Sequence, residues 1–392
     1  MQKINGYFKD GTLGVCIELR NNNYGSMLQS YATQMILSQY GIKYELMEYR
    51  KKYTPKFILK SIPRLFNHVI WEDKYAEYRK KSFLKKHPEL KDVAQQRKTA
   101  FDKFRQQYFT APTTVYTGFD SLVANSKKYC AFFTGSDQLW TPAGLPTNFY
   151  NLMFADKDKL KISYASSFGV KQIPWYQRRR TRDYLQRIQF ISCRETSGSH
   201  IVKELTGRSV PVVIDPTLHF TGEQWNEMLP CEPFTKGKYI LSYILGPDEK
   251  ARAEVVNLKD RTGLKIISIP QFLAPDLKFG DIAAKNAGPA EFVSLIRNAE
   301  FVCTDSFHGT VFSILFKKNF VVFNRYKESY GASKNTRIDS LCNNLGLQER
   351  RFSGNIYTDM VASIDYQKVD THLSNMRDFS KKYLEDAFNT LL

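Results

Sequence analysis

The stretch that decides the fold is Phe301-Val-Cys-Thr-Asp-Ser-Phe-His-Gly-Thr310, followed by Val311-Phe-Ser-Ile-Leu-Phe316. It predicts a buried strand that ends at Asp305, a tight turn, and a helix that opens near Gly309. The first turn of such a helix carries unpaired N–H groups and partial positive charge, so a phosphate or carboxylate binds there readily. His308 lies at the same place and could donate a hydrogen bond or a proton. An ordinary strand-to-helix turn with a solvent-facing histidine is the alternative interpretation.

The same strand–turn–helix pattern recurs along the chain. A strand at 12–19, a helix at 26–39 and a strand at 43–49 form a βαβ unit, and further strands are predicted at 129–134, 161–165, 189–193 and 210–214. After a proline-containing linker at 229–237, a second series has strands at 239–245, 264–269, 301–304 and 320–324. With 392 residues, two domains are the default. We predict α/β domains at 1–228 and 229–365, followed by a C-terminal helix at 366–392.

The net charge of +18 indicates an anionic partner, which could be nucleic acid, an anionic membrane surface or a phosphorylated substrate. Residues 50–105 hold 17 Lys and Arg against 6 Asp and Glu. We predict that 50–110 is a basic, mostly helical insertion in the first domain. A solvated helical hairpin is one interpretation of this segment, and a contact with an anionic membrane surface is the other.

The 6 cysteines are scattered without a Cys-x-x-Cys pair, and no His-x-x-x-His pair occurs, so we expect reduced thiols and no metal site. The N-terminal residues lack the apolar region of a signal peptide, and no apolar run approaches the ~20 residues that span a bilayer. The expected location is the cytoplasm, with a peripheral contact at the inner face of the cell membrane.

Polar motifs follow the predicted strands in a fixed order. They are Asn22-Asn-Tyr-Gly25, Gly135-Ser-Asp-Gln-Leu-Trp140, Ser163-Tyr-Ala-Ser-Ser-Phe-Gly169, Ser192-Cys-Arg-Glu195, Asp215-Pro216 and Thr304-Asp-Ser-Phe-His-Gly-Thr310. The carboxyl ends of parallel strands share one edge of a sheet, so these motifs should converge on one cleft. Together they resemble the polysaccharide pyruvyl transferase family over roughly residues 10 to 325.

The resemblance implies two Rossmann-like domains in a GT-B-like arrangement with the active site between them. It also implies transfer of a carboxyethylidene group from phosphoenolpyruvate to two hydroxyls of one sugar, with no further cofactor. The acceptor would be a bacterial surface polysaccharide or its precursor, linked to undecaprenyl diphosphate. The first domain would bind the acceptor and the second the donor.

One position departs from the family pattern. Better-studied members carry Arg-Leu-His where this chain has Ser306-Phe-His308, and that arginine helps to hold the donor. Either another cation replaces it, with Arg325, Lys317 and Lys318 nearby in sequence, or the donor differs.

The predicted site combines these motifs. Donor-binding residues are Arg194, Ser306, Phe307, His308, Gly309 and Thr310, with the N–H groups of the last two cradling the phosphate. His308 is the candidate general acid, and Asp137 and Asp305 are candidate bases, with N-capping as the alternative for both aspartates. Asn23, Gly25 and Trp140 are predicted to contact the acceptor, and a buried core tryptophan is the alternative for Trp140.

Two other functions remain open from the sequence. A GT-B glycosyltransferase that uses a nucleotide sugar would fit the same architecture, although no nucleobase-binding signature is evident. A nucleic-acid-binding protein would account for the charge and for the aromatic and basic residues of 50–110, but it would leave the strand-end motifs unexplained.

Overall fold

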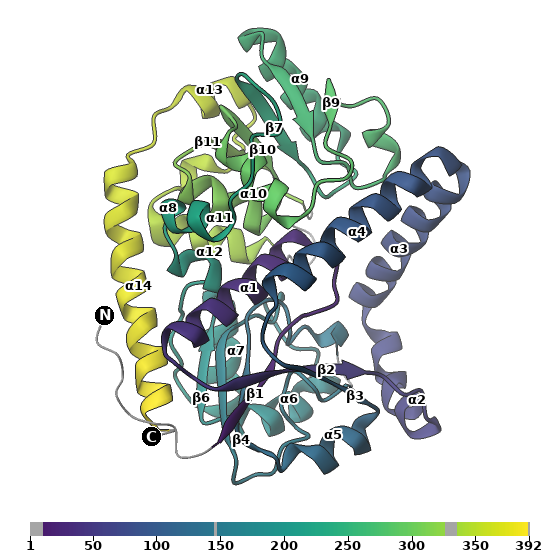
Figure 1. Cartoon of the computed structure of the whole chain (residues 1–392), viewed down its shortest axis with the longest axis vertical. Helices are drawn as coiled ribbons and strands as arrows, with labels where there is room; N and C mark the ends of the chain where they lie inside the picture. The colour runs from purple at the N-terminus through teal and green to yellow at the C-terminus, as the bar shows by residue number, and fades with distance from the viewer. Residues whose placement is uncertain (1–10, 145–146, 326–334, 391–392) are drawn as a thin grey trace.

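The computed structural model describes residues 11–144, 147–325 and 335–390, which form two parallel β-sheets flanked by helices (Figure 1). The strands are β1 (Thr12–Cys16), β2 (Tyr44–Arg50), β3 (Thr113–Thr117), β4 (Tyr129–Thr134), β5 (Leu160–Ser166), β6 (Phe190–Cys193), β7 (Tyr239–Tyr243), β8 (Lys265–Ser268), β9 (Ile282–Ala283), β10 (Phe301–Thr304) and β11 (Asn319–Val322). The α-helices are α1 (Tyr24–Gln39), α2 (Pro55–Ser61), α3 (His68–Lys86), α4 (Lys91–Tyr108), α5 (Phe119–Ser126), α6 (Arg178–Leu185), α7 (Thr196–Thr206), α8 (Gly222–Met228), α9 (Glu249–Thr262), α10 (Pro289–Arg297), α11 (Phe307–Leu315), α12 (Thr336–Leu345), α13 (Ile356–Val361) and α14 (Tyr366–Asn389).

Each sheet contains a point where the strand order reverses direction. The first sheet has the order β3-β2-β1-β4-β5-β6. Strands β2 and β3 therefore lie on one side of the β1/β4 pair, and β5 and β6 lie on the other. The second sheet has the order β11-β10-β7-β8-β9 and reverses at the β7/β10 pair. Ligands of open α/β sheets bind outside the carboxyl ends of the strands at such a reversal. The predicted fold class, two Rossmann-like α/β bodies in a GT-B-like arrangement, is therefore confirmed.

The two sheets are joined through an aromatic contact made by helix α1. The Tyr24 ring stacks on Phe292 of α10 at a centroid distance of 4.7 Å and also contacts Phe101 of α4 and Tyr243 of β7. The Tyr24 hydroxyl donates a hydrogen bond of 2.8 Å to the carbonyl oxygen of Ala287. In Figure 1, α1 lies between the lower first sheet and the upper second sheet. The start of α1 is thereby held against both halves of the protein.

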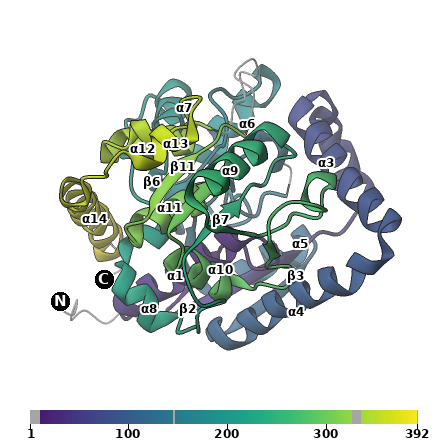
Figure 2. The ribbon, with the colours of Figure 1, turned by 90° about the horizontal axis from the view of Figure 1, so that it is seen from above.

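The insertion between β2 and β3 is helical and reaches the second half of the chain. Helix α4 carries Arg97, whose guanidinium donates hydrogen bonds to the carbonyl oxygens of Pro270 (2.6 Å), Lys285 (2.8 Å) and Ala284 (3.3 Å). The same guanidinium lies 4.6 Å from the ring centroid of Phe272. Figure 2, seen from above, shows α3 and α4 along the outer edge of the molecule. No helix within the described ranges has both the length and the apolar character required to cross a bilayer.

The C-terminal helix α14 packs on the first sheet. The Ser380 hydroxyl accepts a hydrogen bond from the backbone N–H of Ile214, and the Tyr383 hydroxyl donates one to the carbonyl oxygen of Ser163. The chain therefore returns to its first half after it completes the second sheet, as the left edge of Figure 1 shows.

The structure corrects several predicted elements. Residues 210–214 are not a strand: a single bridge joins Cys193 to Val212, because Pro211 has no N–H and the N–H of Ile214 is bound by Ser380. Helices α1 and α11 begin two residues earlier than predicted, with Asn23 and Ser306 as their N-caps. Strand β3 and helix α5 were missed, since β3 is an edge strand with threonine at three of its five positions and has little apolar pattern.

Arg97→Met tests the link between the insertion and the second sheet. The change leaves three carbonyl groups without their charged donor, and we expect it to lower the free energy of unfolding by about 2–3 kcal/mol. Urea unfolding provides the measurement. Lys98→Met, at the neighbouring exposed position of the same helix, is the matched control and should stay within ~0.5 kcal/mol of wild type. Equal stability of the two variants would refute the link.

Candidate active site

A cavity of about 650 Å³ lies where the two strand-order reversals face each other. Glu18 and Asp137, which follow β1 and β4, line it from the first sheet. Leu245 and Asp305, which follow β7 and β10, line it from the second. Of the six motifs predicted to converge on one cleft, those at 22–25, 135–140 and 304–310 contribute lining residues, whereas those at 163–169, 192–195 and 215–216 do not.

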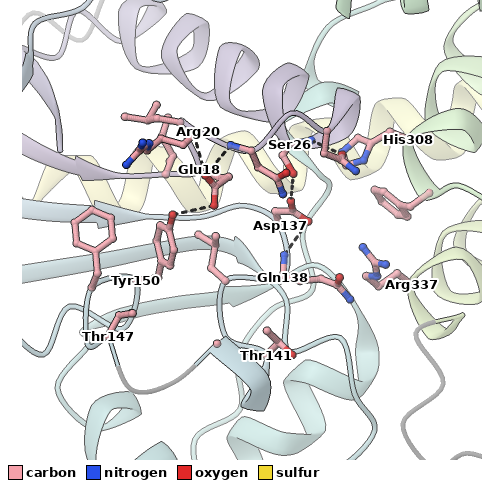
Figure 3. Close-up of a pocket in the computed structure, with 18 of the residues that line it drawn as sticks. Glu18, Arg20, Ser26, Asp137, Gln138, Thr141, Thr147, Tyr150, His308 and Arg337 are labelled. Atoms are coloured by element: carbon pink, nitrogen blue, oxygen red, sulfur yellow. Dashed lines mark hydrogen bonds between the residues drawn. The ribbon is translucent and has the colours of Figure 1, made fainter. Parts of the chain in front are cut away.

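The cavity wall is mostly polar. On the side of the first sheet it carries the rings of Tyr49, Phe149 and Tyr150, and the rings of Tyr49 and Phe149 stack at a centroid distance of 5.5 Å. The charged and polar side chains of the wall are Glu18, Arg20, Asn21, Asn23, Ser26, Glu48, Lys51, Asp137, Gln138, Thr141, Thr147, Asp305, Ser306, His308, Arg325, Asn335 and Arg337. Figure 3 shows ten of the lining residues by name around this space.

His308 reaches the cavity because of how α11 begins. The Ser306 hydroxyl accepts a hydrogen bond from the backbone N–H of Gly309 (3.3 Å) and so caps the helix. A Cβ atom at Gly309 would lie 2.5 Å from the Thr304 hydroxyl oxygen, so only glycine allows this close approach of helix and strand. His308 then occupies the first turn, with its side chain 8% exposed at the cavity wall.

A second glycine fixes the other side of the imidazole. A Cβ atom at Gly25, in the first turn of α1, would lie 2.0 Å from Nδ1 of His308. The ring therefore packs directly on the backbone of α1, and no larger residue fits at position 25 without a shift. The family-like motif around Gly25 thus places the histidine of the second half against the helix of the first half.

Behind the cavity wall lies a buried cluster of charged side chains. Arg194 donates a hydrogen bond of 2.7 Å to Asp215 and lies 3.4 Å from Asp137. Nε2 of His308 faces the other oxygen of Asp215 at 3.6 Å. The side chains of Arg194 and Asp215 are 2% and 0% exposed. Two carboxylates and one guanidinium make this cluster electrically neutral when the imidazole of His308 carries a second proton.

Asp215 is held in its ionised form by several donors. It accepts hydrogen bonds from the Ser136 hydroxyl (3.1 Å), and from both the backbone N–H (3.0 Å) and the hydroxyl (2.7 Å) of Thr217. Burial by itself would raise the pKa of Asp215, but the charges of His308 and Arg194 and these hydrogen bonds hold that pKa well below its usual range.

Asp137 and Asp305, the two predicted bases, both line the cavity and both also shape the backbone. Asp137 accepts hydrogen bonds from the Ser26 hydroxyl (2.7 Å) and from the N–H of Gln138 (2.8 Å). Burial raises its pKa, but Arg194, His308 and Arg337 outweigh that effect and leave it lowered. Asp305 accepts hydrogen bonds from the N–H groups of Leu245 (2.7 Å) and Gly246 (2.9 Å), and burial raises its pKa despite Arg325. Their role as bases stays a prediction.

Five predicted site residues do not line the cavity, namely Gly25, Trp140, Arg194, Gly309 and Thr310. Trp140 is 2% exposed in an apolar cluster with Phe168 and Tyr184, and its indole N–H donates to the carbonyl oxygen of Tyr150. The backbone N–H groups of Gly309 and Thr310 are used by the hydroxyl and carbonyl oxygens of Ser306, so they cannot cradle a phosphate in this conformation. Arg194 is enclosed by its two carboxylates.

Arg194 also contacts the cavity wall indirectly. Its guanidinium lies 4.6 Å from the ring centroid of Phe307, a lining residue, and Arg337 lies 5.7 Å from the same ring. The predicted donor-binding residues Ser306, Phe307 and His308 line the cavity together with Asn23, whose side chain caps α1 through the N–H of Ser26.

Two arginines bring positive charge to the second-sheet side of the cavity. Arg325, named from the sequence as a replacement for the family arginine, lines it, and so does Arg337, which sequence reasoning missed. Lys317 instead forms an ion pair of 2.7 Å with Asp370 at the surface, and neither it nor Lys318 lines the cavity. Arg337 lies twelve positions after Arg325, beyond the last strand, and no motif marks it.

Glu18 was also missed, although it directly follows β1. One of its carboxylate oxygens accepts the N–H groups of Arg20 (3.0 Å) and Asn21 (3.1 Å), and the other accepts the Tyr150 hydroxyl (3.1 Å). Figure 3 shows these contacts on the first-sheet side of the cavity. Glu18 falls inside the strand predicted at 12–19, whereas β1 ends at Cys16, and a lone glutamate after an apolar run was the only signal. Among the described residues, no group of three or more His, Cys, Asp or Glu side chains is arranged to hold a metal ion.

The chain belongs to the polysaccharide pyruvyl transferase family, whose model matches residues 23–326. No curated protein sequence matches it. Among solved structures it is similar to the UDP-GlcNAc 2-epimerase of Neisseria meningitidis bound to UDP-GlcNAc, with 9% identity over 96% of this chain and 93% of that chain and a TM-score of 0.48. The UDP-GlcNAc 2-epimerase of Methanocaldococcus jannaschii in complex with UDP-GlcNAc and UDP shares 12% identity over 84% of this chain and 91% of that chain, with a TM-score of 0.46. The wall teichoic acid polymerase TagF shares 9% identity over 87% of this chain and 100% of that chain, with a TM-score of 0.41.

Asp215→Asn tests the buried cluster. It removes one carboxylate that balances Arg194, and we expect a loss of ~3 kcal/mol of unfolding free energy at neutral pH. Because the pKa of Asp215 is lowered in the folded protein, its contribution is complete above the unfolded value of about 3.9 and declines as the pH falls below it. The difference between wild type and variant should therefore shrink below about pH 4.

Urea unfolding between pH 2.5 and 7 gives the measurement. Asp183→Asn, at an exposed position of α6, is the control and should follow wild type throughout. A difference between wild type and Asp215→Asn that stays constant with pH would contradict the assignment.

Proposed function

We propose that this protein transfers a carboxyethylidene group from phosphoenolpyruvate to two hydroxyls of a sugar in a bacterial surface polysaccharide or its lipid-linked precursor. The observation that carries the proposal is the buried Asp137–Arg194–Asp215 cluster, which presents His308 to a cavity between the two sheets. Membership of the polysaccharide pyruvyl transferase family supports the same chemistry.

The donor would bind on the second-sheet side. Phosphoenolpyruvate carries about three negative charges, and Arg325 and Arg337 bring two positive charges to this side of the cavity. The first turn of α11 adds the partial positive charge of a helix N-terminus. Ser306, which stands where better-studied family members carry arginine, caps that helix, so Arg325 and Arg337 would supply the missing charge.

The acceptor would bind on the first-sheet side. Aromatic rings and hydroxyl or carboxylate groups are suited to a sugar, because the rings contact its apolar faces and the polar groups bind its hydroxyls. Tyr49, Phe149 and Tyr150 provide the rings there, and Glu18 and Asn23 provide polar atoms. The acceptor hydroxyls would thus lie between this wall and His308.

His308 would act as the general acid and then as a base. It gives a proton to the methylene carbon of the enol, the first sugar hydroxyl bonds to the neighbouring carbon, and the proton of that hydroxyl returns to the imidazole. The second hydroxyl then bonds to the same carbon while the carbon–oxygen bond to phosphate breaks, and its proton leaves with the phosphate. Asp215 orients the imidazole, and Asp137 holds Ser26 and Arg194 in place.

Ligand-dependent stability tests the donor. Phosphoenolpyruvate at ~100 times its Kd should stabilise the folded protein by about 2.7 kcal/mol, seen as a rise in melting temperature. Arg337→Met should weaken phosphoenolpyruvate binding by roughly 10-fold or more, which lowers the stabilisation at the same concentration to about 1.4 kcal/mol or less. Lys317→Met, whose side chain pairs with Asp370 at the surface, should leave the stabilisation unchanged. A shift with UDP- or GDP-sugars and none with phosphoenolpyruvate would instead favour a glycosyltransferase.

Gly25→Ala tests the position of His308. The added methyl group requires the imidazole to move, and we expect phosphate release from phosphoenolpyruvate, measured with a panel of glycans, to fall about 10²–10⁴-fold, as in His308→Gln. Gln39→Ala, at the exposed end of the same helix, is the control and should retain full activity. Wild-type rates in Gly25→Ala would show that the position of the ring does not matter for turnover.

A further inference from the structure

The surface of α2, the following 3₁₀ turn (Ile62–Phe66) and α3 is unusual for a protein exterior. Nine large apolar side chains between residues 53 and 78 are exposed by 44% or more of their area. They are Tyr53, Ile58, Leu59, Ile62, Leu65, Phe66, Trp71, Tyr75 and Tyr78, which we call the α2–α3 surface. Figures 1 and 2 both show α3 at the periphery of the molecule, away from the two sheets. So many exposed large apolar side chains in one segment are typical of an interaction site.

The aromatic residues of α3 follow a helical period. Trp71, Tyr75 and Tyr78 are 57%, 63% and 66% exposed, and their spacing of four and three residues places them on one face of the helix. In a helix that packs on a protein core, such a stripe would be buried. Here it faces solvent.

Basic residues outnumber acidic residues in the segment that carries this surface. Residues 51–86 hold 11 Lys and Arg against 3 Asp and Glu, a net charge of +8. The three acidic residues are Glu72, Asp73 and Glu77, and Glu77 already pairs with Lys81 (2.7 Å) and Lys74 (3.7 Å). A partner that binds this surface should therefore provide both an apolar region and negative charge.

The α2–α3 surface begins at the rim of the cavity. Tyr49 and Lys51 line the cavity wall, and Tyr53, two residues further on, is 74% exposed. Leu59 (70%) and Phe66 (77%) follow along the same segment. Whatever binds the surface is thus next to the side of the cavity proposed for the acceptor.

We infer that the α2–α3 surface docks on a membrane that contains anionic phospholipid. Tryptophan and tyrosine rings lie favourably at the level of the lipid headgroups, isoleucine, leucine and phenylalanine enter the acyl boundary, and lysines meet anionic headgroups. A nucleic acid would use the lysines but would leave Ile58, Leu59 and Leu65 in water, and a second copy of this chain would bring the same positive charge. Docking would bring the cavity close to a lipid-linked acceptor, and this consequence rests on the proposed function. The docking inference itself does not rest on the proposed function.

Vesicle co-sedimentation tests the surface without any substrate. The wild-type protein should bind vesicles of phosphatidylglycerol and phosphatidylcholine at least 10-fold more tightly than vesicles of phosphatidylcholine alone. A triple variant, Leu59→Ser with Phe66→Ser and Trp71→Ser, should lose at least 10-fold in binding to the anionic vesicles. The matched control replaces three exposed apolar residues elsewhere, Val256→Ser with Leu277→Ser and Phe379→Ser, and should bind as wild type does.

The outcomes are distinct. Equal binding of the triple variant and the control would overturn the inference, and so would a wild-type dimer that the triple variant abolishes without any vesicle binding. Thermal unfolding, together with phosphoenolpyruvate-dependent stabilisation, should be the same in all three proteins, which shows that the fold and the cavity remain intact. If the wild-type protein does not bind vesicles but is stabilised by phosphoenolpyruvate, the docking inference fails and the proposed function is unaffected. If it binds vesicles but is not stabilised by phosphoenolpyruvate, the proposed function is contradicted and the docking inference is unaffected.

Tryptophan fluorescence gives a second readout. Trp140 and Trp225 are buried, whereas Trp71 and Trp175 are 57% and 83% exposed. In a Trp175→Phe background, the emission of Trp71 should move to shorter wavelength on addition of anionic vesicles, and brominated lipid should quench it. Trp71→Phe in the same background should remove both effects. An unchanged spectrum in the Trp175→Phe protein would overturn the inference.

Discussion

Arg194 and Asp215 are joined by a 2.7 Å ion pair that solvent hardly reaches. Removing two charges from water is costly, and such a pair is tolerated only where further partners satisfy each group. Here Asp215 has Ser136, Thr217 and His308, and Arg194 has Asp137 and the Phe307 ring. These partners come from the loop after β4, from the 3₁₀ turn at Pro216–His219 and from α11 of the second half. The pair therefore fixes the loops of one sheet and, through His308, their position relative to the other.

The topology explains why these loops meet. Each sheet reverses its strand order once, at β1/β4 and at β7/β10, and a crevice opens at the carboxyl ends of those strands. The α1 helix is the first element after β1 and packs through Tyr24 on Phe292 and Tyr243 of the second half. At the next residue, Gly25 lets the imidazole of His308 approach the helix backbone. The first turn of α1 thus makes the contact between the two halves and also packs against the imidazole of His308, the candidate acid.

Much of this arrangement could be predicted from local sequence, because strand ends and helix starts are local features. The cavity is lined by Asp305 through His308, and by Asn23 and Asp137, as expected from the sequence, but not by Gly309 or Thr310. What failed depends on distant contacts. Trp140 belongs to the same motif as Asp137, which lines the cavity, but its indole packs on Phe168 and Tyr184 instead. Arg337 lies in α12, beyond β11 and outside any recognised motif, and only the folded chain shows that it lines the same cavity as Arg325.

The role of the insertion between β2 and β3 follows only when its composition and its structure are considered together. Composition alone leaves a basic helical hairpin and a membrane contact equally open. The structure shows that the apolar residues of α2 and α3 stay exposed while α4 packs inward, with Phe101 against Tyr24 and Arg97 bound to three carbonyl groups of the second half. The insertion is therefore attached to both halves through α4. Because α2 begins only four residues after Lys51, which lines the cavity, anything that binds the α2–α3 surface is held close to the cavity rim.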